Sequence, residues 1–236
     1  MATDAWADRR RWQEAVGGVL AVLVVSNVLS NRVLPAWAYV PWSVAVAAAV
    51  VLIVRRVVTV EQMGFTEWKR GAAFGLVLFV LTAGVLTVAV AMPVFNEMYQ
   101  DRRVGDGADL WLYHAFVRIP FGTALLEETA FRAVLPALFA VRWGVLRGCV
   151  VASVCFGVWH VLPALGLNEV NPVATRIFGE GAGGVAAAVV FAVVGTTFAG
   201  LWWCWVRYRA RSVLATILGH VATNSVAYTI AWIIAG

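Results

Sequence analysis

One stretch decides the fold of this chain: residues 111–141, which read WLYHAFVRIPFGTALLEETAFRAVLPALFAV. The stretch is long and apolar enough to cross a bilayer, whose hydrocarbon core takes about 20 apolar residues in a helix. Two adjacent carboxylates, Glu127 and Glu128, nevertheless stand in its middle. An ionisable side chain inside a bilayer costs about 2.5–3.5 kcal/mol on insertion scales, so we expect these two to serve function.

The composition of the whole chain agrees with a membrane protein. Of its 236 residues, 62% are hydrophobic and 13% are charged, and the mean hydropathy is +0.83. A soluble domain usually carries about 25% charged residues, so this chain cannot cover a water-facing surface. Its twelve Trp fit the same interpretation, because Trp favours the membrane–water interface. The three cysteines lie in apolar runs without metal-ligand spacing and are interpreted as core residues.

Seven apolar runs have the length of a membrane span, and we expect an all-α, polytopic transmembrane helical bundle. The fourth run contains Pro120 and Pro136, so it is either kinked or divided in two, which gives about 7–8 spans. The runs cover residues 15–31, 37–54, 71–92, 111–141, 148–166, 184–206 and 213–234.

The basic residues predict the orientation, because the cytoplasmic loops of membrane proteins carry an excess of Lys and Arg. With the N-terminus in the cytoplasm, twelve basic residues fall on the cytoplasmic side and four fall outside. The net charge of +5 is therefore a topology signal and does not indicate a nucleic-acid partner. The cytoplasmic set is Arg9, Arg10, Arg11, Arg55, Arg56, Lys69, Arg70, Arg142, Arg147, Arg207, Arg209 and Arg211, and the outer set is Arg32, Arg102, Arg103 and Arg176.

The first run allows a second interpretation. Three arginines, an apolar stretch and the sequence Ala36-Trp37-Ala38 are also the pattern of a signal peptide with its cleavage site. The apolar stretch is long and a second run begins immediately after it, so we expect a retained first helix.

Few other polar side chains lie inside the runs, and their spacing is informative. Glu128 and Arg132 are four residues apart, which places them on one helical face as an ion pair. Glu127 lies about 100° around the helix and is free to point elsewhere. His220 and Asn224, also four residues apart, share one face of the seventh run.

The expected depths of these groups agree across three helices. At about 1.5 Å per residue from the cytoplasmic ends, Glu127 lies about 22 Å deep and His160 about 18 Å deep. On the same count Asn224 lies about 17 Å deep and His220 about 11 Å deep. The sequence therefore predicts that these four side chains meet toward the cytoplasmic half of the membrane.

These residue types suit hydrolysis of an acyl bond without a covalent nucleophile. A carboxylate near an imidazole can hold and deprotonate water, which makes Glu127 the expected general base and Glu128 the structural anion. His220 and Asn224 are donors that can hold an oxyanion, and a serine mechanism has no GxSxG motif to support it. We expect no cofactor; the alternative is a zinc ion held by Glu127, His160 and His220, although no HExxH pattern is present.

Three short motifs follow one another along the apolar runs: Glu127-Glu128-x-x-x-Arg132, Phe156-x-x-x-His160 and His220-x-x-x-Asn224. Together they resemble the CAAX protease and bacteriocin-processing (CPBP, or Abi) family of intramembrane proteases, which is related to the type II CAAX prenyl endopeptidase. The resemblance covers residues 112–230. It implies an endopeptidase in which the first glutamate and the second motif's histidine activate water, the third motif stabilises the oxyanion, and the remaining Glu and Arg complete the first motif.

The resemblance also implies partners and an organisation. The expected substrate is a membrane-embedded or lipidated protein or peptide within the lipid bilayer, with no nucleic acid. We expect N-terminal transmembrane helices in residues 1–110 and a catalytic transmembrane core in residues 111–236, within one integral membrane domain. A composition rich in Ala and Val favours a bacterial plasma membrane.

Two other functions remain open from the sequence. A proton-coupled transporter could use the same buried polar residues as a relay, although the chain lacks the repeated halves that transporters usually show. A non-catalytic membrane scaffold would keep the fold without the activity.

Overall fold

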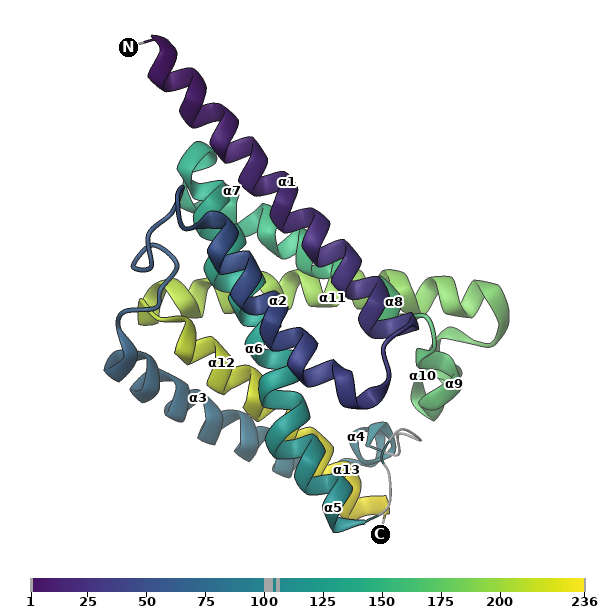
Figure 1. Ribbon diagram of the computed structural model, residues 1–236. Coiled ribbons are helices and arrows are strands. Elements are labelled where there is room, and N and C mark those ends of the chain that lie inside the picture. The colour runs from purple at the N-terminus through teal and green to yellow at the C-terminus, as the bar shows by residue number, and fades with distance from the viewer. Residues whose placement is uncertain (1, 100–103, 105–106, 236) are drawn as a thin grey trace.

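The computed structural model describes residues 2–99, 104 and 107–235, and every regular element within these ranges is a helix (Figure 1). The predicted all-α bundle is therefore confirmed. Six of the described helical stretches are long and apolar enough to cross a membrane, so the chain is an integral membrane protein. They are Asp8–Arg32, Ala36–Val54, Trp68–Ala89, Ala108–Ala164, Gly181–Ala210 and Val213–Ala235.

The elements follow one another with short connections. The N-terminal part holds α1 (Ala2–Arg32), η1 (Ala36–Ala38), α2 (Tyr39–Val54), α3 (Trp68–Ala89) and α4 (Pro93–Met98). The helix of the two glutamates is built from α5 (Ala108–Tyr113), η2 (His114–Ala124), α6 (Leu125–Glu128), η3 (Thr129–Val134) and the first part of α7 (Leu135–Trp159). The remaining elements are α8 (Val161–Ala164), α9 (Leu167–Val170), α10 (Pro172–Phe178), α11 (Gly181–Ala210), α12 (Val213–Val221), η4 (Ala222–Val226) and α13 (Ala227–Ala235).

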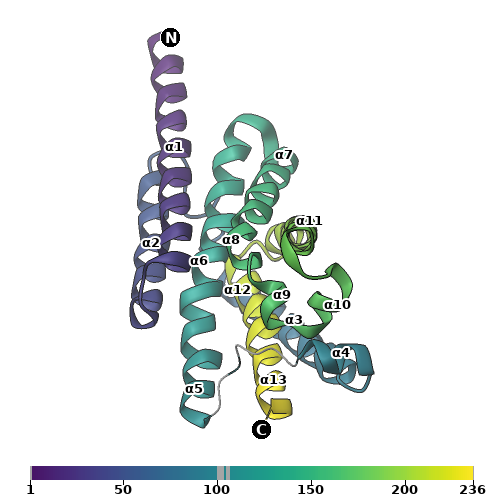
Figure 2. The same ribbon diagram turned by 90° about the vertical axis from the view of Figure 1, so that its right-hand side faces the viewer.

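The stretch Ala108–Ala164 contains two of the predicted runs. Gly144 within α7 has φ 77° and ψ 165°, a backbone conformation that glycine adopts without a steric cost. The chain turns back there, and Figure 2 shows the two arms of α7 as a hairpin. All seven predicted runs are thus helical, with the break between the fourth and the fifth at Gly144.

Neither proline divides the fourth run. Pro136 lies in the first turn of α7, and Pro120 lies inside η2, which is π-helical. In a π turn the backbone N–H bonds the carbonyl five residues earlier, as the Leu125 N–H does with the Pro120 carbonyl. The run therefore stays one continuous, locally widened helix between Ala108 and the turn at Gly144.

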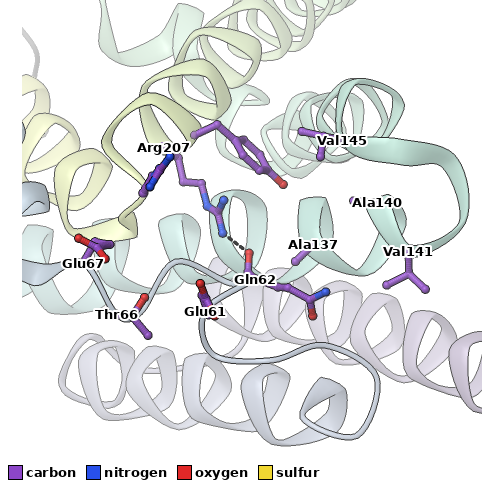
Figure 3. A pocket seen from close by; sticks show the side chains of 11 residues that line it. Glu61, Gln62, Thr66, Glu67, Ala137, Ala140, Val141, Val145 and Arg207 are labelled. Atoms are coloured by element: carbon purple, nitrogen blue, oxygen red, sulfur yellow. Dashed lines mark hydrogen bonds between the residues drawn. The ribbon is translucent and has the colours of Figure 1, made fainter.

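The loops that carry the predicted cytoplasmic arginines gather at one end of the bundle. In Figure 3 the Arg207 guanidinium donates from Nη2 to the backbone carbonyl oxygen of Gln62, in the loop between α2 and α3. Arg70 Nη2 donates to the carbonyl oxygen of Arg209 over 2.9 Å. Arg142, beside the hairpin turn, lies 5.9 Å from the ring centroid of Trp12 in α1.

The predicted outer residues lie away from that end. Arg32 ends α1 and Arg176 lies in α10; in Figure 1 the C-terminal end of α1 and α10 lie at the right, opposite the loop between α2 and α3. Arg102 and Arg103, the other two residues of the predicted outer set, lie outside the described residues. The described members of the two predicted sets thus lie at two ends of the bundle; which end faces the cytoplasm stays a prediction.

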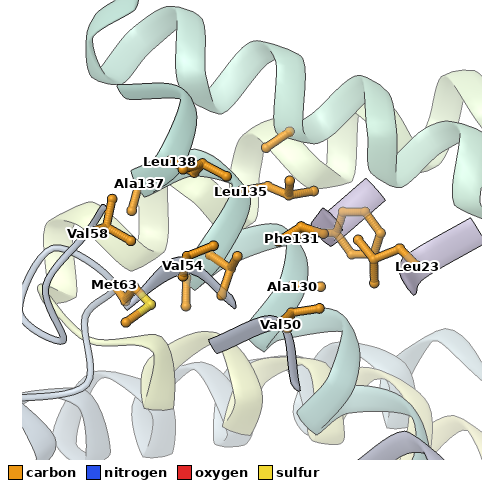
Figure 4. Close-up of a cluster of buried hydrophobic side chains, with 14 of the residues drawn as sticks. Leu23, Val50, Val54, Val58, Met63, Ala130, Phe131, Leu135, Ala137 and Leu138 are labelled. Carbon is orange, nitrogen blue, oxygen red and sulfur yellow. The ribbon is translucent and has the colours of Figure 1, made fainter. Parts of the chain in front are cut away.

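The main apolar cluster surrounds the helix of the glutamates. Side chains of α1, α2 and the segment η3–α7 meet there, among them Leu23, Val50 and Phe131 (Figure 4). By contrast, α3 leaves most of its apolar surface uncovered: Val80 is 68% exposed and Val88 is 72% exposed. An apolar helix face without a protein partner suits contact with lipid tails.

Small residues let pairs of helices approach closely, as is usual inside membranes. Gly75 of α3 faces α12, and a Cβ atom there would lie 2.6 Å from Cδ1 of Leu218. Gly157 of α7 faces α11, and a Cβ atom there would lie 2.7 Å from the carbonyl oxygen of Val193. These contacts set the positions of α7, which ends directly before His160, and of α12, which carries His220.

Candidate functional site

The two glutamates lie in α6, a single α-helical turn between two π-helical segments, η2 and η3. Such π turns are often found at functional sites, where they change the direction of the side chains around them. Both carboxylates are buried and face α12, so they point into the bundle and away from lipid.

Glu128 is fully buried between two partners. Its Oε2 lies 3.4 Å from Nε of Arg132, the ion pair that the four-residue spacing predicts. Its Oε1 lies 2.8 Å from Nδ1 of His220, on α12. The second contact joins residues 92 positions apart in the sequence, and the spacing pattern did not reveal it.

Arg132 is also fully buried, and an aromatic ring completes its surroundings. Its Cζ lies 4.0 Å from the ring centroid of Phe156, an arrangement in which the ring face attracts the guanidinium charge. The Phe of the second motif therefore contacts the Arg of the first. A buried charge without such compensation would be strongly destabilising.

Glu127 points elsewhere than Arg132, as its position on the helix predicts, and it has partners of its own. It is 8% exposed, and its Oε1 accepts a hydrogen bond from Nε1 of Trp159 over 3.0 Å. Its Oε2 lies 3.9 Å from Nε2 of His220. Sequence reasoning overlooked Trp159, because a tryptophan in an apolar run was attributed to the membrane interface; its place directly before His160 was the available signal.

His220 lies between the two glutamates and Asn224. A carboxylate accepts hydrogen bonds, so Nδ1 of His220 carries the proton in its bond to Glu128. Nε2 lies 3.1 Å from Nδ2 of Asn224, which donates to it when the imidazole is neutral. The predicted shared face of His220 and Asn224 is therefore present, and the two side chains contact each other.

His160 reaches this cluster through Phe156, whose ring lies edge-on to the imidazole with the ring centroids 4.5 Å apart. Its Nδ1 lies 2.8 Å from the carbonyl oxygen of Phe156, and because a carbonyl only accepts, Nδ1 is the donor. The Nε2 atom of the half-buried ring then keeps its lone pair. Among the described residues no hydrogen bond joins His160 to Glu127; the link between them is Trp159, the neighbour of His160 in sequence.

The zinc alternative does not fit these positions. Within the described ranges no group of three His, Cys, Asp or Glu side chains has an arrangement that could hold a metal ion. Both ring nitrogens of His220 have protein partners in this arrangement, Glu128 at Nδ1 and Asn224 at Nε2. Independence from a metal cofactor stays a prediction.

A cavity of about 500 Å³ lies elsewhere, at the end of the bundle that carries the basic loops. Figure 3 shows its lining, which includes Ala137, Arg207 and Glu67. None of the six candidate residues lines this cavity in the described part of the chain. The polar cluster is therefore distinct from the open hollow at the loops, and its residues Glu127, Glu128 and His220 are buried within the helices.

Comparison with known proteins gives one match. A protein-family model described as "Type II CAAX prenyl endopeptidase Rce1-like" matches residues 109–226. The matched segment runs from α5 to the end of η4 and contains all six candidate residues. No curated protein and no solved structure matches the chain.

Proposed function

This chain belongs to the type II CAAX prenyl endopeptidase Rce1-like family, and we infer that it is an intramembrane endopeptidase that hydrolyses a peptide bond of a membrane-associated protein or peptide. One observation carries this proposal: a single buried imidazole, that of His220, lies 2.8 Å from Glu128 and 3.9 Å from Glu127. A proton acceptor and a charge-stabilising donor thus lie side by side among buried side chains. Residues 111–236 would form the catalytic core, supported by the helices of residues 1–110.

Glu127 is the proposed general base. Trp159 occupies its Oε1, which leaves Oε2 to take a proton from water. The unshared electron pair on Nε2 of His160 is the second acceptor for that water, because Nδ1 is committed to the Phe156 carbonyl. When the water transfers a proton to Glu127, its oxygen can form a bond with the carbonyl carbon of the scissile peptide.

His220 and Asn224 are the proposed donors to the carbonyl oxygen, which gains the negative charge in this step. Two glutamates and one arginine leave the buried cluster with one net negative charge, and a protonated His220 neutralises it. In that form Nε2 of His220 donates, and Nδ2 of Asn224 is released from it to donate as well. The proton on Glu127 then passes to the amide nitrogen as the C–N bond breaks.

Glu128 and Arg132 have a positioning role in this scheme. Glu128 holds Nδ1 of His220 and so directs Nε2 toward the reacting carbonyl. Arg132 balances the Glu128 charge and is itself held against the ring of Phe156. The proposed reaction needs no metal ion at any step.

The proposed substrates are membrane-embedded or lipidated proteins, cut in the cytoplasmic half of a bacterial plasma membrane. A chain that is mostly lipid-facing meets its substrate within the bilayer. The basic loops at one end of the bundle support the cytoplasmic placement of that end.

The test compares membranes from cells that carry the wild-type gene with membranes from cells that carry Glu127→Ala, by quantitative proteomics of protein termini. We expect the wild type to produce new termini that the variant lacks, while both proteins insert and purify equally. If the variant produces the same termini, the protease assignment is wrong, and a relay for transport or a scaffold would be the remaining functions.

A further inference from the structure

Trp159 connects the candidate base to a part of the chain outside the family match. It is the last residue of α7, and its indole Nε1 donates to Oε1 of Glu127 over 3.0 Å. Its half-buried ring packs edge-on against Phe131, with the ring centroids 5.6 Å apart. The indole is therefore held both by its hydrogen bond and by the apolar cluster around the glutamate helix.

The backbone of Trp159 is held from α1. In a continuing α-helix the Trp159 carbonyl would accept from the residue four positions later, which is Pro163 and has no N–H. Asn27 of α1 supplies the missing donor: its Nδ2 lies 2.9 Å from the Trp159 carbonyl oxygen. Asn31 donates to Oδ1 of Asn27 over 2.7 Å, which fixes the orientation of the Asn27 amide.

We propose that Trp159 is a positioning residue for Glu127, and that Asn27 of α1 sets the place of Trp159. The indole engages one carboxylate oxygen, so the other, Oε2, is the oxygen that faces His220 and the water. This inference rests on the proposed function, since it concerns the geometry of the same base. It also gives α1, which lies outside residues 109–226, a defined effect on the reaction.

The expected loss of kcat follows from the role of the Trp159–Glu127 hydrogen bond in holding the carboxylate in place. A hydrogen bond to a carboxylate is stronger and shorter than a neutral one, so it holds the group in one rotamer. Displacement of a reacting group by about 1 Å can lower a rate by about 10²-fold. Loss of the indole N–H should therefore lower kcat and leave substrate binding unchanged.

The first test replaces Trp159 by Phe, which keeps an aromatic ring and removes the donor. We expect kcat for cleavage of a wild-type substrate to fall about 10- to 100-fold, with KM within about twofold of the wild type. The matched control is Trp12→Phe. That change removes an indole bond of 2.8 Å to the carbonyl of Leu138, on the same helix α7, and does not touch Glu127. Its kcat should stay within about twofold of the wild type.

The second test addresses α1. Asn27→Ala leaves the Trp159 carbonyl without a donor and should lower kcat at unchanged KM, by less than Trp159→Phe does. Its control is Ser26→Ala, the neighbouring buried residue, whose hydroxyl accepts from Trp42 of α2 and makes no bond to α7.

Three outcomes decide the proposal. It is overturned if Trp159→Phe turns over as fast as Trp12→Phe, or if its loss of activity resides in KM alone. If Trp159→Phe does not fold, 3-benzothienylalanine at this position keeps the bicyclic ring without the N–H and is held to the same kcat criterion. Full activity of Glu127→Ala would instead refute Glu127 as the base, and with it the proposed mechanism on which this inference rests. Neither Trp variant can give that result.

Discussion

Two identical side chains in one helical turn have different surroundings. Glu128 is enclosed by a guanidinium and an imidazole, so its charge is compensated on both sides. Glu127 has an indole donor on one oxygen and, on the other, a histidine nitrogen at 3.9 Å. The first arrangement suits a permanent anion. The second leaves one carboxylate oxygen able to gain and lose a proton, which is what a general base requires.

At the residue scale, Glu128 and Arg132 are expected to stabilise the fold only when both are present, because either one alone would be a buried charge without its partner. Arg132→Met removes one partner and leaves Glu128 buried and undercompensated, which should lower the free energy of unfolding by about 3–5 kcal/mol. Adding Glu128→Gln to Arg132→Met removes the stranded charge and should recover part of that loss. Denaturant titration in detergent micelles, for the two single variants and the double variant, measures this coupling. Strictly additive effects would contradict it.

Metal independence is a second expectation at this scale. Both nitrogens of His220 bond to protein partners, so no open metal position is built from it. Purified protein dialysed against a zinc chelator should keep its full cleavage rate, and elemental analysis should find less than stoichiometric zinc. Loss of activity together with one zinc per chain, both reversed by added zinc, would contradict this expectation.

At the scale of elements, four-residue spacing predicted the contacts correctly even where the helix is widened. Glu128 and Arg132 meet although η3 is π-helical, and His220 meets Asn224 across the start of η4. A π turn has more residues than an α turn, but side chains four apart still lie on one face. Spacing alone did not predict the π-helical turns, since no local sequence pattern marks the position of the extra residue in such a turn.

At the scale of elements, two glycines of α3 are predicted to respond differently to replacement by alanine. A Cβ atom at Gly75 would lie 2.6 Å from Leu218 Cδ1 and 2.8 Å from its Cβ, so Gly75→Ala should push α3 from α12 and cost about 1–3 kcal/mol. Gly84 on the same helix has open space around it, and Gly84→Ala should be neutral or slightly stabilising. Thermal unfolding of the two variants measures the difference; equal melting temperatures would contradict the close approach of these helices.

At the scale of the whole molecule, helix packing brings the basic residues of different loops to the same end of the bundle. The hydrogen bonds of Arg207 and Arg70 tie the loop after α2 and the start of α3 to the end of α11, so arginines that are far apart in sequence share one end. That end also holds the cavity of about 500 Å³. The arginines that are predicted to orient the chain in the membrane therefore also join its loops.

The orientation is testable with single cysteines at the two ends. Val60, 57% exposed, lies in the loop at the basic end, and Ile177, 65% exposed, lies in α10 at the other. In a background without the three native cysteines, a membrane-impermeant maleimide added to intact spheroplasts should label Ile177→Cys. It should label Val60→Cys only after the membrane is opened. The reverse pattern would place the N-terminus outside.

The sequence by itself determined the long apolar helices and the short-range pairs. Apolar runs of sufficient length have to be helical in lipid because every backbone polar group must be satisfied within its own segment. The four-residue rule likewise places Glu128 beside Arg132 whatever surrounds them. These features depend on residues close in sequence, which a local pattern can describe.

Only the tertiary structure decided which side chains meet between helices. Glu128 reaches His220 across 92 positions, Trp159 reaches Glu127 across 32, and Asn27 reaches Trp159 across 132. Such contacts depend on the rotation and depth of each helix, which are set by close packing at glycines and in the apolar cluster. Periodicity states which face of a helix is polar, but packing decides what that face meets.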